Sequence, residues 1–211
     1  MSHRFIDISW PLHGKTVSYK NRHPIVIEVL RTMAEHGIAD SRCGSLHMHA
    51  GTHIDAPNHC IEGGKSIEQL PLEAMNGMCR VLDLTSIVGD RIEADDLKQF
   101  AIQPGERILL KTINSSMPAG GAYCFDEMYV AASAAQYLVQ CGIVLIGVDA
   151  LGLERNQPAY DSHRAFFNAG VVIVEGLRLA QVNSGMQYTL HLLPLAFVGT
   201  EAAPARAVLS F

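Results

Sequence analysis

Four side chains that can bind a metal ion lie within eleven consecutive residues of the chain. They are His49, His53, Asp55 and His59. Neutral imidazole and carboxylate groups are the usual protein ligands of Zn²⁺ and similar ions, and a catalytic site needs about three of them with one position left for water. Because His49, His53 and Asp55 supply such a set, the spacing predicts a divalent metal centre.

The backbone of this segment determines whether the ligands can meet. In an extended chain, alternate residues share a face, so His49, Gly51, His53 and Asp55 would line up. In a helix, His49 and His53 would still be neighbours, at positions i and i+4. Both conformations let these two imidazoles share one ion. A lone His-x3-His pair is weak evidence, but here Gly51 and Pro57 also set the backbone around four such groups.

His59 has a different expected role. Pro57 redirects the chain just before it, and an imidazole with a pKa near neutrality suits proton transfer. We expect His59 to act as general acid and base, with a further metal ligand as the alternative. Cys60 follows directly and raises the alternative of a metal-free cysteine hydrolase, but adjacent side chains of an extended chain point to opposite faces. We expect His47 to be a packed or solvated histidine.

The elements that must position these groups alternate between strand and helix over much of the chain. Periodicity and turn residues predict strands at Phe5–Trp10, Arg80–Leu84, Arg107–Thr112, Ile143–Val148, Val171–Val174, Tyr188–Phe197 and Ala205–Leu209. They predict helices at Leu72–Met75, Asp95–Phe100, Asp126–Gln140 and Ser162–Asn168. Residues 25–36 combine a strand-like start with a helix-like end, and we favour an extended start.

Two further side chains that can bind a metal ion lie at the ends of predicted elements, and these elements could converge on one cleft. His163 lies near the start of the helix expected at 162–168, and Glu175 directly follows the strand expected at 171–174. A carboxylate at that position is not expected in the core, and Asp149 after the strand at 143–148 is either structural or part of a cleft. The sequence pattern alone does not bring these residues to the segment 49–59.

Composition and charge limit the function classes. A chain of 211 residues with 48% hydrophobic and 18% charged residues fits one folded domain, here residues 1–211. The net charge of −5 gives no basic surface for nucleic acid or an anionic membrane, and no apolar run is long enough to cross a bilayer. No export signal is recognised, so we expect a cytoplasmic protein with a small-molecule substrate. Five widely spaced cysteines argue against a disulfide framework or a Cys-rich zinc site.

One segment resembles the signature of a known family. Residues 49–59 read His-Ala-Gly-Thr-His-Ile-Asp-Ala-Pro-Asn-His, and this is similar to the signature of the cyclase family of metal-dependent hydrolases. The family includes bacterial kynurenine formamidases and isatin hydrolases. Looser matches extend over most of the chain, at residues 5–9, 66–84 and 147–149 and at the spaced pair His163 and Glu175 before Gly176.

The resemblance implies metal ligands at His49, His53, Asp55, His163 and Glu175. The first three would hold one ion, Asp55 and Glu175 would bridge to a second, and His163 would complete the second site. The cofactor would be one or two divalent ions per subunit, either one Mn²⁺ or a pair of Zn²⁺ ions.

The resemblance also implies a fold, an assembly and a reaction. The fold would be an α/β arrangement with a mixed β-sheet or barrel-like core and flanking helices, of the swivelling β/β/α type. The assembly would be a homodimer or homotetramer with active sites near subunit contacts. The reaction would be hydrolysis, by metal-activated water and with His59 as general acid and base, of a small amide such as the arylformamide N-formylkynurenine of tryptophan catabolism, or of a cyclic amide or lactone. The alternative is a non-catalytic metal-binding or sensory module, for which closed ligation and no pocket would be expected.

The loop after the first strand departs from the formamidase pattern. Formamidases carry a Trp-Pro-Gly-Asp-like segment there, whose aromatic ring packs on the substrate, whereas this chain has Val17-Ser18-Tyr19-Lys20-Asn21. We expect Tyr19 to take the aromatic role and contact the substrate. The resemblance to the family therefore supports the metal chemistry of this chain more directly than it supports a particular substrate.

Overall fold

The core of the protein is a mixed barrel of β-strands. The computed structural model describes residues 4–17, 19–21 and 25–211, so Ser18 of the predicted substrate loop lies outside the described residues. The strands of the large sheet are β1 (Phe5–Asp7), β4 (His53–Asp55), β5 (Asn76–Asp83), β7 (Arg107–Lys111), β9 (Leu145–Val148), β10 (Val172–Glu175), β11 (Tyr188–Pro194) and β12 (Ala202–Ser210).

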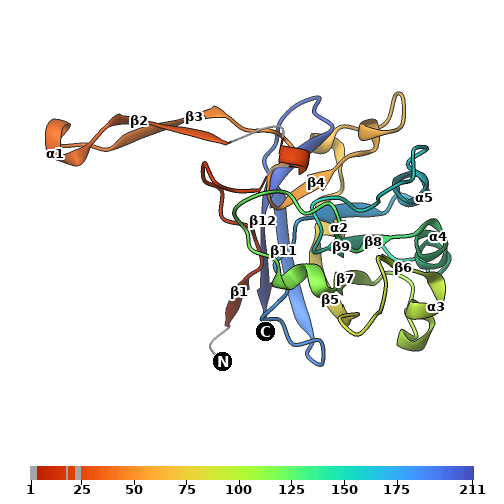
Figure 1. The fold of residues 1–211 in the computed structure, drawn as a ribbon. Coiled ribbons are helices and arrows are strands. Elements are labelled where there is room, and N and C mark those ends of the chain that lie inside the picture. Colours follow the sequence, from red (N-terminus) through yellow and green to blue (C-terminus); the bar gives the residue numbers. More distant parts are fainter. Residues whose placement is uncertain (1–3, 18, 22–24) are drawn as a thin grey trace.

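The barrel closes because its two terminal strands, β12 and β4, pair with each other. The order of the described strands is β12-β11-β5-β7-β9-β10-β4, and β4 pairs back to β12, while β1 pairs with the other end of β12 (Figure 1). The strands β5, β7, β9 and β10 are parallel neighbours, and the remaining pairs of this sheet are antiparallel. The predicted α/β fold with a barrel-like mixed sheet is confirmed.

Short helices and turns connect the strands. The α-helices are α1 (Met33–His36), α2 (Leu72–Met75), α3 (Ala94–Leu97), α4 (Ala132–Gln140) and α5 (Asp161–Asn168). The 3₁₀ turns are η1 (Tyr19–Asn21), η2 (Pro57–His59), η3 (Ile67–Gln69), η4 (Lys98–Phe100) and η5 (Ile113–Ser116), and β6 (Arg91–Ile92) pairs with β8 (Tyr129–Val130). Among the described residues, none of these helices is long and apolar enough to cross a membrane.

Alternation along the barrel strands separates two hydrophobic cores. In β7, Leu109 belongs to the core enclosed by the barrel, whereas Ile108 and Leu110 belong to the core shared with the helices. In β10, Val174 likewise faces the barrel interior and Ile173 faces the helix side. Both β9 and β10 are buried along their whole length, as expected for parallel strands covered on both faces.

The helix predicted at Asp126–Gln140 begins later, at Ala132. The predicted start of this helix at Asp126 was therefore wrong. Residues 126–131 are not helical, because the Met128 backbone N–H donates to Asn114 Oδ1 and because β8 pairs with β6 within this stretch. Tertiary hydrogen bonds thus override the helical spacing of the apolar residues.

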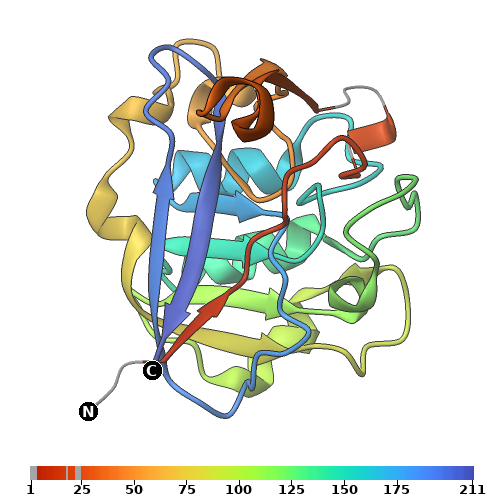
Figure 2. The same ribbon diagram turned by 90° about the vertical axis from the view of Figure 1, so that its left-hand side faces the viewer.

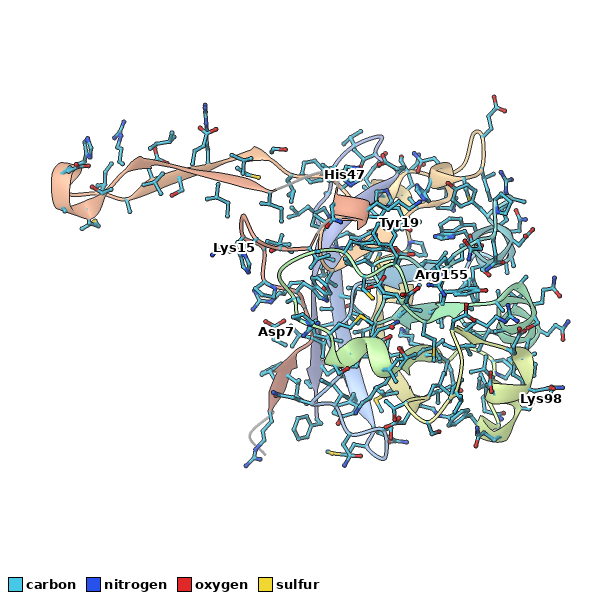
Figure 3. All side chains as sticks on the ribbon, viewed as in Figure 1. Asp7, Lys15, Tyr19, His47, Lys98 and Arg155 are labelled. Carbon is cyan, nitrogen blue, oxygen red and sulfur yellow. The ribbon has the colours of Figure 1, made fainter. Side chains whose placement is uncertain are left out.

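The ambiguous residues 25–36 contain both structures that the sequence suggested. β2 (Val26–Arg31) is followed by α1, which begins after the N-cap Thr32 and ends at Gly37 with a φ of 69°. β2 pairs with β3 (Asp40–Ser45), and we call β2, α1 and β3 together the arm. The arm is a ribbon that extends away from the barrel (Figures 1 and 2), and His47 lies where the arm joins the barrel (Figure 3).

Candidate metal centre

The pairing of β4 with β10 brings predicted ligands face to face. The register places Glu175 opposite His53 and Ile173 opposite Asp55. Because Ile54 packs in the barrel interior, His53 and Asp55 on either side of it point outward, toward the same side as Glu175. His53 Nε2 lies 3.2 Å from Glu175 Oε2 and 3.3 Å from Asp55 Oδ1. Strand register therefore joins groups that are far apart in the sequence.

His49 reaches the same carboxylate from a tight turn. The residues from Met48 to Thr52 are neither extended nor helical, and Gly51 has a φ of 60°. The extended conformation considered for residues 49–55 is therefore confirmed for His53–Asp55 and wrong for the part that carries His49. Thr52 Oγ1 donates to the backbone oxygen of Gly176, and a Cβ on Gly176 would collide with the Gly51 oxygen. This close approach holds the turn against the end of β10, and His49 Nδ1 lies 3.0 Å from Asp55 Oδ1.

His59 returns to the cluster because the chain turns at Pro57, the first residue of η2. The centroid of its ring lies 4.6 Å from that of His49 and 5.7 Å from that of His163. Burial lowers the pKa of His59 and outweighs the opposing effect of the Asp55 carboxylate. The imidazole is therefore neutral near pH 7 and can accept a proton.

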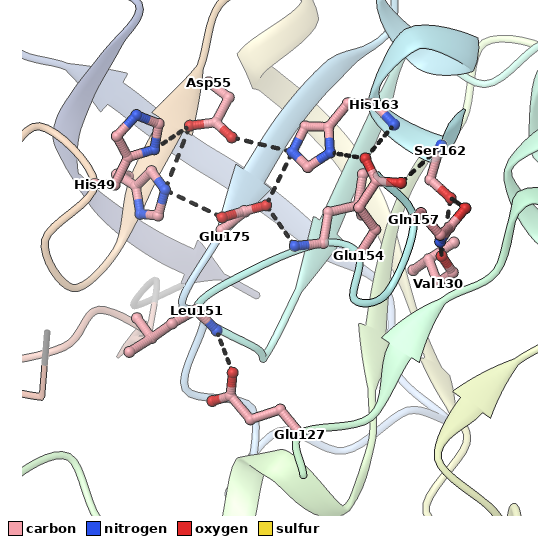
Figure 4. Close-up of polar contacts among 12 residues, drawn as sticks. His49, Asp55, Glu127, Val130, Leu151, Glu154, Gln157, Ser162, His163 and Glu175 are labelled. Atoms are coloured by element: carbon pink, nitrogen blue, oxygen red, sulfur yellow. Dashed lines mark hydrogen bonds and ion pairs between the residues drawn. The ribbon is translucent and has the colours of Figure 1, made fainter. Parts of the chain in front are cut away.

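A carboxylate outside the predicted set holds His163 in place. His163 Nε2 lies 3.4 Å from both Asp55 Oδ2 and Glu175 Oε1 (Figure 4). Its Nδ1 contacts Glu154 Oε1, which also accepts the backbone N–H of His163, while Glu154 Oε2 accepts the backbone N–H of Ser162. Glu154 thus caps the first turn of α5 and favours the ring tautomer whose Nε2 lone pair faces the cluster.

The donor atoms at the centre of the cluster fit a divalent cation. Among the described residues, His53 Nε2 and both Asp55 carboxylate oxygens are buried and make no hydrogen bond. Buried polar atoms are nearly always satisfied, and imidazole with carboxylate is a ligand set for Zn²⁺ or Mn²⁺. Donor atoms of His53, Asp55 and Glu175 lie within 4.8 Å of one another, as do those of His49, Asp55 and His59. The residues present therefore fit one ion, or two ions that share Asp55.

Negative charge dominates the centre of the cluster. The side chains of Asp55, Glu175 and Glu154 are each at most 4% exposed. Burial opposes a charge on His53, but the Asp55 and Glu175 carboxylates outweigh it and raise the pKa of His53 to about 10. Buried carboxylates require a compensating positive charge, which protons or a metal ion would supply.

The cluster lies in a cavity of about 300 Å³ that is lined in part by tyrosines. Tyr19, the predicted substrate contact, lines this cavity and packs edge-on against Tyr123 with ring centroids 5.2 Å apart. The ring of Tyr160 lies 6.1 Å from that of His59. Tyr19, Glu154 and Tyr160 also line an adjoining hollow of about 970 Å³. A closed structural metal site would not have this access.

Three groups near the cluster were not predicted from the sequence, namely Glu154, Tyr160 and Glu201. Glu201 Oε1 lies 3.4 Å from His49 Nε2 because β12 places the next residue, Ala202, opposite Asp55. No spacing in the sequence signals these positions, since each depends on barrel closure or on the loop between β9 and α5.

The sequence did not decide whether Asp149 and Cys60 have a structural or a functional role, and the contacts of both residues in the structure indicate a structural one. Asp149 accepts hydrogen bonds from the backbone N–H and the hydroxyl of both Thr112 and Ser115, so its carboxylate ties loops together. Cys60 packs against the core beneath the helices, and burial raises the pKa of its thiol. A raised thiol pKa disfavours the thiolate that a cysteine nucleophile needs.

Replacing Glu154 by glutamine is expected to weaken binding of the ion at His163 by about 10- to 100-fold, because the ring loses its charged hydrogen-bond partner. Calorimetric metal titration of the variant measures this affinity independently of activity. Asp161→Asn is the matched control, because Asp161 also places a carboxylate in the first turn of α5 but is exposed. Equal affinities in wild type and Glu154→Gln would show that Glu154 serves the helix alone.

A second buried carboxylate predicts a pH-dependent stability. Glu127 accepts the backbone N–H of Leu151, a residue that lines the cavity (Figure 4). Burial raises the pKa of Glu127 from the ordinary value of 4.5 to about 7. The folded state therefore binds more protons than the unfolded state between these values, so stability falls as pH rises through this window and levels off above it.

Glutamine at position 127 removes this pH-dependent loss. Between about pH 5 and about pH 8, the metal-free Glu127→Gln protein is expected to gain about 3 kcal/mol in free energy of unfolding relative to wild type. Urea unfolding of both proteins at the two pH values measures the difference. The same difference at both pH values would contradict the raised pKa.

Known proteins of similar sequence and fold support a hydrolase assignment. Residues 6–155 match the family described as "Putative cyclase". The chain is 32% identical over 208 residues to a kynurenine formamidase of Bacillus cytotoxicus, and this alignment covers 97% of this chain and 96% of the relative. A solved "predicted metal-dependent hydrolase" from Bacillus stearothermophilus is 39% identical with a TM-score of 0.87, over 100% of this chain and 99% of the other. Isatin hydrolase A from Ralstonia solanacearum shares the fold at 20% identity and a TM-score of 0.83, over 99% and 92% of the two chains.

Proposed function

Because this chain belongs to the cyclase family, we propose that it is a metal-dependent hydrolase of a small amide, with an arylformamide such as N-formylkynurenine as the first candidate substrate. Cyclic amides and lactones are the second candidates, since an isatin hydrolase shares the fold. The observation that carries the proposal is the buried Asp55 carboxylate, which makes no hydrogen bond and lies between His49, His53 and His163.

The ligand set would serve the reaction through a bound divalent ion. We assign His49, His53, Asp55, His163 and Glu175 as its ligands, with Asp55 and Glu175 as the groups able to bridge two ions. When bound, an ion of this kind lowers the pKa of a coordinated water to about 7 and polarises a carbonyl oxygen.

His59 supplies the proton transfers. Its ring is neutral near pH 7, because burial lowers its pKa, and it lies beside His49 and His163 at the cavity. It would take a proton from the attacking water as the new carbon–oxygen bond forms. It would return that proton to the departing nitrogen as the carbon–nitrogen bond breaks, which leaves an amine and a carboxylic acid.

The tyrosines would bind the aromatic part of the substrate. Tyr19 and Tyr160 both line the cavity and the adjoining hollow, so a ring between them would lie next to the metal ligands. Edge-to-face and offset contacts between aromatic rings favour such an arrangement. An arylformamide fits this arrangement, because its formyl group is bonded through nitrogen to its aromatic ring. The ring could therefore lie between the tyrosines while the formyl group lies beside the metal ligands.

The test compares metal-free and metal-loaded protein on three substrates. Chelated and dialysed protein should not hydrolyse N-formylkynurenine, isatin or a simple lactone, and added Zn²⁺ or Mn²⁺ should restore hydrolysis, fastest for N-formylkynurenine. Cys60→Ala should keep the full rate, which distinguishes this mechanism from a cysteine hydrolase. A full rate in the presence of chelator would contradict metal dependence, and metal binding without turnover of any substrate would favour a non-catalytic module.

A further inference from the structure

The hollow of about 970 Å³ that adjoins the cavity extends the space around the metal centre. It shares Tyr19 and Tyr160 with the cavity, so a substrate whose reacting group lies at the metal ligands would reach into the hollow with its far end. The rest of the lining includes charged side chains, namely Lys20, Asp90, Asp126 and Arg155. These charges decide which chemical group the hollow can accept.

The guanidinium group of Arg155 is already paired with both acidic side chains. Its Nη2 lies 2.9 Å from Asp90 Oδ2, and its Nη1 lies 3.5 Å from Asp126 Oδ1. Two carboxylates beside one guanidinium leave an excess of negative charge around Arg155. This end of the hollow therefore attracts a cation and repels an anion.

Lys20 differs from Arg155, because it makes no ion pair with any described residue. Its side chain is exposed, and its Nζ lies 5.0 Å from the centroid of the Tyr19 ring. A cation at this distance is attracted by the face of an aromatic ring. Since Tyr19 also lines the cavity, a single aromatic ring separates the unpaired ammonium group from the metal centre.

The backbone around Lys20 is held in an unusual conformation. Lys20 has a φ of 53° and Asn21 a φ of 57°, in the left-handed region that favours glycine. Asn21 Oδ1 accepts the backbone N–H of Tyr123 over 2.7 Å, and the ring of Tyr123 packs edge-on against that of Tyr19. Strained conformations of this kind persist where the surrounding contacts determine them, and they cluster at ligand-binding sites. A fixed turn thus presents Lys20 to the hollow.

We propose that Lys20 is a specificity-determining residue that binds a carboxylate on the side chain of the substrate. The inference rests on the proposed function and narrows its candidates, because it favours arylformamides with an anionic side chain over neutral cyclic amides and lactones. With the formyl group at the metal ligands and the aromatic ring beside Tyr19, the side chain of that ring would lie in the hollow. Its carboxylate would accept a charged hydrogen bond from Lys20 Nζ. An ammonium group on the same side chain would face the negative charge around Arg155.

Two arylformamides that differ in this carboxylate alone test the proposal, namely N-formylkynurenine and its decarboxylated analogue N-formylkynuramine. Metal-loaded wild type should have a kcat/KM at least about 10-fold higher for the substrate with the carboxylate. Lys20→Gln should bring the ratio of the two values close to one, mainly through KM, because the lost contact serves binding. Lys20→Arg keeps the charge and should retain most of the preference.

Lys15→Gln is the matched control for the loss of a positive charge. Lys15 precedes Lys20 in the same loop and is also exposed, but it lines neither the hollow nor the cavity. The control should therefore keep the wild-type ratio of kcat/KM values. Because both lysines are exposed, circular dichroism should show native folding in every variant.

Binding of the two reaction products tests Lys20 without any turnover. In calorimetric titrations of the metal-loaded protein, wild type should bind kynurenine about 10-fold more tightly than kynuramine, and Lys20→Gln should bind both alike. A wild-type protein that does not bind kynurenine more tightly than kynuramine would overturn the proposal. So would a preference that stays unchanged in Lys20→Gln. If neither formamide is hydrolysed, the proposed function fails, and the titrations still decide the role of Lys20.

Discussion

Replacing Asp55 by asparagine is expected to abolish metal binding and to lower kcat/KM by about 10³-fold or more. The Asp55 carboxylate lies 3.0 Å from His49 Nδ1, 3.3 Å from His53 Nε2 and 3.4 Å from His163 Nε2, so every arrangement of one or two ions in this cluster uses it. Asparagine has nearly the same shape but lacks the charge. Elemental analysis and steady-state kinetics on one preparation measure both effects.

Thermal stability separates this prediction from misfolding. The metal-free Asp55→Asn protein should have a Tm close to that of metal-free wild type, because the neighbouring imidazoles can release their protons. The rise in Tm that added Zn²⁺ causes in wild type should disappear in the variant. Glu127→Gln is the matched control, since it neutralises a buried carboxylate outside the cluster and should retain the ion. Wild-type metal affinity in Asp55→Asn would refute the ligand assignment.

Replacing His59 by alanine is expected to lower kcat by about 10²- to 10⁴-fold while the bound metal stays. His59 is neutral near pH 7 and lies beside the cluster, and the ligand set His53, Asp55 and Glu175 remains intact without it. KM should change little, because the lost group transfers protons and does not hold the substrate. Stopped assays together with metal analysis of the same sample provide the measurement.

The bound metal of this variant decides between the two roles considered for His59. Donor atoms of His49, Asp55 and His59 lie within 4.8 Å of one another, so a ligand role is geometrically open. Loss of metal from His59→Ala would make it a ligand, and an unchanged kcat would remove it from the reaction. External imidazole should partly restore the rate of the alanine variant if the missing group is a proton carrier.

The local part of the site was predictable from the sequence, and the distant part was not. His49, His53, Asp55 and His59 lie within eleven residues, and ligand chemistry alone marked them. The sequence pattern by itself could not join Glu175 to them, because that contact depends on the antiparallel register of β4 and β10. The family resemblance supplied this pairing and that of His163.

Fold prediction succeeded where local periodicity decides the structure and failed where tertiary contacts do. The buried runs that became β9 and β10 were recognisable because both faces are covered. The start of α4 was misplaced because Asn114, distant in sequence, binds Met128. The turn at Gly51 was also missed, since it depends on the close approach of Gly176 from the end of β10.

Anomalous diffraction at the absorption edge of the ion that the purified protein carries tests the central claim most directly. A strong peak is expected about 2.0 to 2.2 Å from His53 Nε2 and from an Asp55 carboxylate oxygen, with a second peak near His163 and Glu175 if two ions bind. Crystals of hydrolytically active protein with no peak among these residues would contradict the account.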